Sequence, residues 1–361
     1  MPAVAPAGAV KTREDENMKV LLTGGEGYIG TQLGPLLLER GHDVHVYDTG
    51  YHRVGWLYDG VEAAPQWKRL DTRITEPRHI EGFDAIIHLA DLSNDPVGEL
   101  DPELTFKINH EATVRLAGMA KQAGVERFVY ASSCSVYGAS GGDSDELSTE
   151  ESATAPITAY AKCKVRVEND LRPMADETFT PVFLRNATAF GASPRMRFDL
   201  VVNELTAMAY LDRKLVLESD GTPWRPFVHI RDISKAMMCA MEAPAGVVAG
   251  EAFNVGDSRA NYQVRDICTI IGEEIPGCEV VIGELGGDTR NYRVDFTKIN
   301  TQLPGFSCDW DVRKGVAELR DIFDRIEFDS SILHSRRHRR LKQIQYLLDT
   351  GQIDDQFYWK V

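Results

Sequence analysis

The residues with the clearest capacity for chemistry are Tyr160 and Lys164, in the segment TAYAKCK at 158–164. On a helix, the i, i+4 spacing places the two side chains on one face. A lysine ammonium there, joined by any further positive charge nearby, stabilises a phenolate and lowers the pKa of the tyrosine towards neutrality. The phenol then becomes a candidate general base.

By itself the Tyr-x-x-x-Lys pattern says little, because chance matches abound and the alternative is a pair of surface residues. Its context in this sequence makes it informative. Ser133 lies 27 residues before Tyr160, in RFVYASSCSVYG at 127–138. That segment is a predicted strand running into a serine-rich turn. A glycine-rich loop of the type that binds dinucleotides precedes both.

This loop is VLLTGGEGYIG at 20–30, with Gly24, Gly27 and Gly30 after an apolar strand and before a helix. Gly24 allows the tight turn, and Gly27 lets the backbone approach a pyrophosphate. Gly30 lets the helix pack close to the sheet, with its N-terminus towards the phosphates. We expect Tyr28 and Ile29 to contact the same cofactor.

The next predicted strand, DVHVYD, ends in Asp48, 18 residues after Gly30. A carboxylate at this point accepts hydrogen bonds from the adenosine ribose hydroxyls and repels a 2′-phosphate, which favours NAD over NADP. The alternative for Asp48 is an ordinary turn residue after a strand. With the glycine loop in place, the sequence predicts an NAD site.

The elements that must position these residues alternate between strands and helices. Helical patterns near 28–40, 105–123 and 158–176 separate the strand-like runs MKVLLT, DVHVYD, DAIIHLA, RFVYAS and PVFLRN. This alternation predicts an α/β protein with a parallel sheet covered on both faces. The pattern is less regular later, where apolar runs occur near 215–217, 227–230 and 252–255.

Composition excludes several classes of protein. The chain has 361 residues, 43% hydrophobic and 26% charged, so it can bury a sizeable core. Lys and Arg total 40 against 55 Asp and Glu, a net charge of -15 that argues against nucleic-acid binding. No apolar run approaches the ~18 residues of a membrane span. The six cysteines are scattered, so we expect no metal site and a cytoplasmic protein with reduced thiols.

The chain divides into four predicted parts. Residues 1–17 are Ala/Pro-rich and then charged, which predicts a disordered leader. We expect an NAD-binding Rossmann domain over 18–185, with later strands returning near 225–260, and a mainly substrate-binding domain over 186–327. A basic helical tail follows over 328–361.

Within this tail, SRRHRRLKQIQYLLDTGQ at 335–352 has the pattern of a basic amphipathic helix in an acidic protein. One interpretation is a surface for an anionic substrate, a membrane or a partner. The other is a solvated charged face whose Leu/Ile stripe packs on the body of the protein or on a second subunit.

Taken together, these segments resemble the extended short-chain dehydrogenase/reductase family, in its branch of nucleotide-sugar epimerases and dehydratases. The resemblance runs from about Met18 to about Lys314. The matching segments are TGGEGYIG, Asp48, the Asp71-Thr72-Arg73 turn, HLAD at 88–91, SSCSVYG at 132–138, YAKCK and PFVHIRDIS at 226–234. The family implies a doubly wound Rossmann sheet, a smaller C-terminal α/β substrate domain, NAD as cofactor and a nucleotide-diphosphate sugar as substrate.

The resemblance also implies roles for individual residues. Tyr160 would be the base, Ser133 would hydrogen-bond the reacting sugar hydroxyl, and Lys164 would hold the nicotinamide ribose and tune Tyr160. Further cofactor contacts would come from the adenine side, from the strand ends and from the helix that follows: Asp71, Thr72, Leu89, Ala90, Asp91, Asn109, Ala131 and Ser132.

Substrate contacts follow from the same resemblance. Ser93 and Asn94 stand where the branch contacts the hexose, and Asn203 resembles a nucleotide-side contact. Thr188 stands where many relatives have Asn. Arg225 and Arg290 are candidates for the diphosphate, since a guanidinium fork matches two phosphates. Many relatives have an arginine near the position of Leu285, so Arg290 or Arg293 would have to take the place of that arginine. The alternative for each of these arginines is an ordinary surface charge.

The reaction is inferred from the serine-rich turn. The 4,6-dehydratases of the branch have Thr-Asp-Glu where this chain has Ser133, Cys134 and Ser135. Sugar-acid decarboxylases and 5,6-dehydratases tend to keep Glu at the position of Ser135. The turn therefore favours a 4-epimerase, which needs no net redox change and can keep its cofactor bound. A dehydratase, a 4-keto-sugar reductase and a non-catalytic NAD(P) sensor remain as alternatives.

Three further expectations complete this interpretation. Cys134 is either an acid/base thiol with a depressed pKa or a small buried residue, and we favour the second. His88 is expected to be structural. The family resemblance implies a homodimer formed through the helices near 105–123 and 158–176.

Overall fold

The computed structural model describes residues 17–59, 64–93, 95–138, 146–285 and 291–360. The leader expected over 1–17 therefore lies almost wholly outside the described residues. Folded structure begins with a strand at Lys19, one residue after the predicted start of the Rossmann part.

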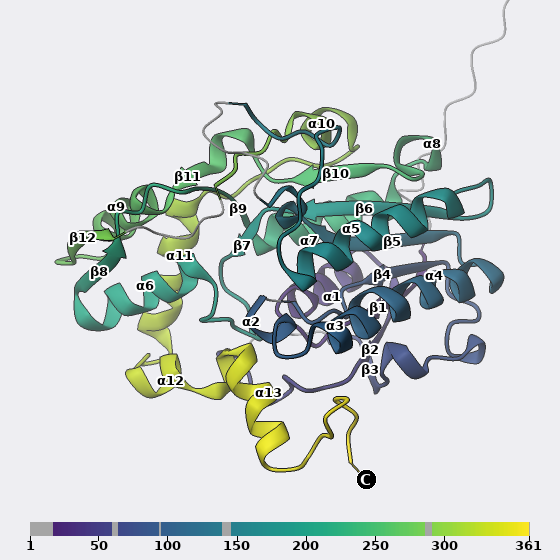
Figure 1. The fold of residues 1–361 in the computed structure, drawn as a ribbon, viewed down its shortest axis with the longest axis horizontal. Helices are drawn as coiled ribbons and strands as arrows, with labels where there is room; N and C mark the ends of the chain where they lie inside the picture. Colours follow the sequence, from purple (N-terminus) through teal and green to yellow (C-terminus); the bar gives the residue numbers. More distant parts are fainter. Residues whose placement is uncertain (1–16, 60–63, 94, 139–145, 286–290, 361) are drawn as a thin grey trace, which may run out of the picture.

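A seven-stranded parallel sheet forms the centre of the molecule, in the order β10-β6-β5-β4-β1-β2-β3 (Figure 1). The strands are β1 (Lys19–Thr23), β2 (Asp43–Asp48), β3 (Gln66–Arg69), β4 (Ala85–His88), β5 (Arg127–Ser133), β6 (Thr180–Asn186) and β10 (Ala252–Val255). Chain order reverses between β1 and β4, which is the switch point at which doubly wound sheets bind ligands beyond the carboxyl ends of their strands. The predicted Rossmann α/β class is confirmed.

Helices cover both faces of this sheet because its strands are apolar on both sides. Val20 and Leu22 face one core, with α1 (Gly30–Glu39) and α7 (Ile230–Glu242). Leu21 faces the other core, with α4 (Ala112–Gln122) and α5 (Ala159–Leu171). This alternation is the period of two of a buried strand.

The helices that carry the candidate site begin at side-chain caps. Thr158 accepts a hydrogen bond from Ala161 N and starts α5, two residues before Tyr160. Asp101 caps α3 (Pro102–Phe106), so the helix expected over 105–123 begins earlier. A π-helical turn over Lys107–Glu111 joins α3 to α4.

A second group of elements lies beside the sheet, at the left of Figure 1. It contains a three-stranded sheet in the order β11-β9-β7 and a two-stranded parallel sheet of β12 and β8. Their strands are β7 (Thr188–Phe190), β8 (Lys214–Ser219), β9 (Trp224–His229), β11 (Asn261–Gln263) and β12 (Glu279–Leu285). The helices packed with them are α6 (Val201–Asp212), α9 (Val264–Glu274) and α11 (Val312–Arg325). Short helices elsewhere are α2 (Asp95–Gly98), α8 (Ala245–Val248) and α10 (Thr297–Gln302).

The C-terminal segment differs from the continuous helix expected over 335–352. It forms α12 (Ser330–His334), a 3-10 turn over Arg336–His338 and α13 (Arg340–Asp349), drawn in yellow in Figure 1. Arg339 is extended, with φ -133° and ψ 112°, and separates the turn from α13. Ile344 and Leu347 of α13 are buried against the loop after β2 and against α2 and α3. The apolar stripe therefore packs on the body of the protein.

Replacing Ile344 with alanine should destabilise the protein, because it removes part of this packing. Ile344 is fully buried, and a buried Ile→Ala change costs about 2–5 kcal/mol. We expect the free energy of unfolding, measured in urea by circular dichroism, to fall by that amount. Leu341→Ala is the control, because Leu341 on the same helix is 36% exposed. Equal losses in the two variants would contradict docking of the tail.

Candidate active site

A pocket of about 700 Å³ opens at the switch point of the central sheet. Its walls come from the carboxyl ends of β1, β2, β4, β5 and β6, from α5 and from the second group of elements. Nineteen of the residues predicted from sequence line it: Gly24, Gly27, Tyr28, Ile29, Gly30, Asp48, Asp71, Thr72, Leu89, Ala90, Asp91, Ser93, Ala131, Ser132, Ser133, Tyr160, Lys164, Thr188 and Arg225.

The glycines after β1 serve two different purposes. Gly24 has φ +76°, and a Cβ there would lie 2.7 Å from Ala90 N; a Cβ at Gly30 would lie 2.4 Å from the Cα of Gly25. These two are needed by the protein's own packing. A Cβ at Gly27 would meet only the carbonyl oxygen of Gly24, at 3.1 Å, yet Gly27 lines the pocket. Its missing side chain leaves room for a ligand, as a bound pyrophosphate requires.

Asp48 is fixed at the end of β2 by backbone donors. Its Oδ2 accepts from Glu26 N at 3.1 Å and its Oδ1 from Gly50 N at 2.7 Å. Burial raises the pKa of this carboxyl, and the two N–H groups act in the opposite direction. The carboxylate lines the pocket on the same side as the glycine loop, which fits an adenosine ribose.

The most buried charges of the site are Lys164 and Asp91. Lys164 Nζ lies 2.5 Å from Asp91 Oδ2, and both side chains are less than 5% exposed. Lys164 also donates to the carbonyl of Ala131, and the Tyr130 hydroxyl donates to Asp91 Oδ2 at 3.2 Å. Burial alone would lower the pKa of Lys164, but Asp91 and Tyr160 outweigh it and keep the pKa above its ordinary value.

Tyr160 and Ser133 lie beside this ion pair. The ammonium of Lys164 is 5.1 Å from the centre of the Tyr160 ring. Burial raises the pKa of the Tyr160 phenol; Lys164 and a hydrogen bond with Ser133 lower it, while Asp91 and Asp95 raise it. Without a further positive charge, the phenol stays protonated at neutral pH. Ser133 itself accepts from Ser135 N at 3.1 Å.

Two predicted residues prove to hold the scaffold. Asn109, in the π-helical turn, bonds the backbone of Leu92 in both directions, at 2.8 and 3.1 Å, and does not line the pocket. Asn203 accepts from Gly191 N and donates to the Tyr28 hydroxyl and is likewise absent from the lining. Both side chains are fully buried, so each orients the wall behind a cofactor or substrate position.

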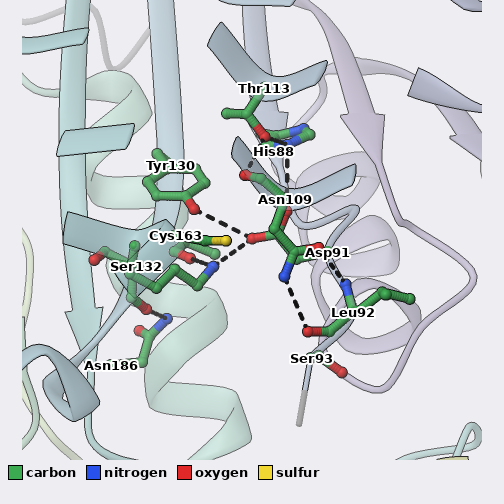
Figure 2. A network of polar contacts seen from close by, with 12 residues as sticks. His88, Asp91, Leu92, Ser93, Asn109, Thr113, Tyr130, Ser132, Cys163 and Asn186 are labelled. Carbon is green, nitrogen blue, oxygen red and sulfur yellow. Dashed lines mark hydrogen bonds and ion pairs between the residues drawn. The ribbon is translucent and has the colours of Figure 1, made fainter. Parts of the chain in front are cut away.

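His88 and Cys134 also have structural environments. The ring nitrogens of His88 lie 2.6 Å from Thr23 Oγ1 and 2.8 Å from Thr113 Oγ1 (Figure 2), and burial lowers its pKa to about 4. The Cys134 thiol donates to the carbonyl of Arg185 at 3.0 Å, and burial raises its pKa well above the ordinary value. These contacts favour a structural His88 and an inert Cys134.

On the substrate side, Arg225 lines the pocket and donates to the carbonyl of Trp224 at 2.7 Å. Ser93 Oγ accepts from Arg197 Nη1 at 3.3 Å. The candidates Asn94 and Arg290 lie outside the described residues. Of the described residues, no cluster of three or more His, Cys, Asp or Glu side chains is arranged to hold a metal. Nor does this part of the chain include a helix long and apolar enough to cross a membrane.

Sequence reasoning missed several lining residues: Tyr51, His52, Ser135, Arg197, Asp199, Tyr292 and Arg340. The Oγ of Ser135 is buried without a hydrogen-bond partner in the described structure, which leaves it free for a substrate. Arg197 and Asp199 form a bidentate ion pair, in which Nε lies 2.9 Å from Oδ1 and Nη2 lies 3.1 Å from Oδ2. Arg340 belongs to the basic tail, and the only sequence signal for it was that unusual charge.

Known proteins resemble this chain over most of its length. A family model described as the NAD dependent epimerase/dehydratase family matches residues 20–256. A UDP-glucose 4-epimerase of Schizosaccharomyces pombe is 26% identical over 330 residues, covering 83% of this chain and 91% of that protein. UDP-glucuronic acid decarboxylase 1 of Xenopus tropicalis is 28% identical over 236 residues, covering 64% and 55%. The solved structure of MoeE5 in complex with UDP-glucose and NAD is 25% identical, with a TM-score of 0.71, covering 86% of this chain and 100% of that one.

A methyl group at Gly27 should weaken cofactor binding, whereas one at Gly24 should lower the stability of the fold. Gly27→Ala should leave the unfolding midpoint close to that of the wild type and weaken NAD binding by at least about 10-fold, because the added Cβ occupies ligand space. Gly24→Ala should instead destabilise the fold by roughly 1–2 kcal/mol or more, since its φ is +76°. Calorimetric titration with NAD and urea unfolding measure the two effects. Wild-type NAD affinity in Gly27→Ala would contradict this placement of the cofactor.

Proposed function

The chain belongs to the NAD dependent epimerase/dehydratase family, and from this premise we propose that it inverts C4 of a nucleotide-diphosphate sugar through a transient 4-keto intermediate. The observation that carries this proposal is the arrangement of Tyr160, Ser133 and Lys164 at one wall of the pocket, beside a serine turn that contains no carboxylate. Relatives named as UDP-glucose 4-epimerases support the same reaction class.

The residues that would hold NAD fit that group. Gly27 leaves open the space that a pyrophosphate needs, and Asp48 presents a fixed carboxylate to a ribose. Asp71 and Thr72 line the adenine end of the pocket, while Ala131 lies at the strand end beside Lys164. When bound, NAD supplies the hydride acceptor and a positive charge next to Tyr160.

Tyr160 acts as the base on the sugar 4-hydroxyl. Its phenolate would take the hydroxyl proton as C4 gives up its hydride and the ketone forms, and the resulting phenol would return that proton when hydride comes back to C4. Ser133 orients the reacting oxygen, and Lys164 holds the ribose side of the cofactor and favours the phenolate electrostatically. Burial and Asp91 raise the pKa of Tyr160, and the positive charge of bound NAD would act in the opposite direction.

The serine turn supports epimerisation over elimination. Loss of water from C5–C6 needs an acid and a base near those carbons, and Cys134 and Ser135 occupy the two positions at which relatives carry them. The Cys134 thiol is turned to a backbone carbonyl, with a raised pKa. A 4-keto sugar formed here would therefore turn over and be reduced on its other face. The homodimer stays a prediction from the resemblance, and the cytoplasmic location stays a prediction from the scattered cysteines.

A panel of nucleotide sugars tests this function. The purified protein is incubated with NAD and each sugar, and the products are analysed by mass spectrometry and proton NMR. We expect an unchanged mass and an inverted C4 signal for at least one sugar. Loss of water would identify a dehydratase. In a parallel incubation supplied with NADH, net consumption of NADH would identify a reductase; either result would overturn the proposal.

Within that assay, Tyr160→Phe should lower turnover by about 10²–10⁴-fold, because the proton acceptor is removed. NAD affinity should change little, since the ring and Lys164 remain. Tyr210→Phe is the matched control: the Tyr210 hydroxyl bonds Asp324 at the surface and does not line the pocket. Turnover in Tyr160→Phe equal to that of the control would disprove the role of Tyr160 as the base.

A further inference from the structure

Arg340 carries the C-terminal tail into the pocket. It is the first residue of α13, is 4% exposed, and lines the pocket together with Asp48, Arg197 and Asp199. This tail lies beyond residues 20–256, which the family model matches.

The neighbouring charges already have partners. Asp199 binds Arg197 through two contacts, and Asp48 accepts from two backbone N–H groups. Arg195 donates to the carbonyls of Glu26 and Gly55, at 3.1 and 2.6 Å. In contrast, Nη1 of Arg340 is buried and has no hydrogen-bond partner in the described structure.

A buried guanidinium with an unused donor is costly unless an anion meets it. Burial and then Arg197 lower the pKa of Arg340 to about 9, Arg195 acts in the same direction, and Asp199 and Asp48 oppose it. Nδ1 of His52, also in the lining, is a second buried polar atom without a partner in this part of the chain. Arg340 and His52 are close enough to interact electrostatically, so these two unpartnered polar groups mark one place for a polar ligand.

The position of Arg340 identifies the ligand's chemistry. It lies near enough to Asp48 to interact electrostatically, and Asp48 marks the ribose end of the dinucleotide site. α13 begins at Arg340 and has no side-chain cap, so the positive end of its dipole is at the same place. A guanidinium fork and a helix N-terminus both favour phosphate oxygens. Asp48 would repel a 2′-phosphate, which leaves the diphosphate between the two nucleosides.

We propose that Arg340 binds the diphosphate of the bound dinucleotide, so that the C-terminal tail is a working part of the cofactor site. This inference rests on the proposed function, in that it takes NAD as the dinucleotide. The tail packs over the loop after β2 through Ile344 and Leu347, which holds Arg340 at the pocket. Cofactor binding therefore depends on a segment outside the region that the family model matches.

Calorimetric titration of Arg340→Gln tests the proposal with three probes: NAD, ADP-ribose and UDP. Loss of a charge-assisted hydrogen bond should weaken NAD and ADP-ribose by about 10- to 100-fold and leave UDP unchanged. Arg340→Lys should recover part of the affinity, because it keeps the charge but not the fork. Lys342→Gln, an exposed change of the same charge on the same helix, should bind all three probes like the wild type.

Thermal unfolding of the same variants separates a binding role from a structural one. Arg340→Gln removes a buried charge that has an unpaired donor and lies near Arg197 and Arg195, so without ligand its midpoint should equal or exceed that of the wild type, while its stabilisation by NAD shrinks. A lower midpoint without ligand together with wild-type affinity for ADP-ribose would overturn the proposal and make Arg340 a structural residue.

The remaining outcomes are also decisive. Weakened UDP binding with unchanged ADP-ribose binding would assign Arg340 to the diphosphate of the substrate and overturn its assignment to the cofactor. A wild-type protein that binds neither NAD nor ADP-ribose would overturn the proposed function itself. Wild-type NAD binding that Arg340→Gln does not alter would overturn only the role of the tail.

Discussion

The site depends on the buried ion pair between Lys164 and Asp91. It joins α5 to the loop after β4, and through the Lys164 contact to Ala131 it joins both to the end of β5. Removing one partner of such a pair costs about 3–5 kcal/mol, because the other charge is left buried and uncompensated. The pair thus fixes the lysine at the place where Tyr160 needs it, and it also cancels much of that lysine's charge.

This partial cancellation bears on the proposed role of Tyr160 as a base. The phenol is buried, and the negative charges of Asp91 and Asp95 oppose the help that Lys164 gives. A positively charged cofactor ring at the strand ends would shift the balance towards the phenolate. The protein would then hold its proton acceptor inactive until the cofactor is bound, which suits the proposed epimerisation, since that reaction returns every hydride it removes.

The central fold and the core of the site could be predicted from the sequence because their signals are local. Gly24, Gly27, Gly30 and the Tyr160–Lys164 spacing each reflect the geometry of a single turn or helix, and alternating apolar runs predict the parallel sheet. Contacts between distant segments left no such signal. Asn109 was expected near the cofactor. In the structure its side chain hydrogen-bonds the backbone of Leu92, a contact that depends on how the π-helical turn is placed against the loop after β4. No local sequence pattern encodes that placement.

The tail shows the same limit more strongly. Its apolar stripe and basic charge could be read from the sequence. The extended conformation of Arg339, after which α13 begins at Arg340, could not. That break determines that Arg340 enters the pocket while the exposed Lys342 does not. Asp48 and Arg340 are distant in sequence and line the same pocket because the tail packs over the loop after β2. No pattern within either segment contains that information.

The most direct test of this account is the pKa of the Tyr160 phenol with and without NAD. The chain has 12 tyrosines, so the titration of Tyr160 is obtained from phenolate absorbance as the difference between the wild type and Tyr160→Phe. The account predicts a pKa above the ordinary tyrosine value in the protein alone and a clearly lower one at saturating NAD. An equal pKa in the two states, or a phenol already ionised at neutral pH without NAD, would contradict it.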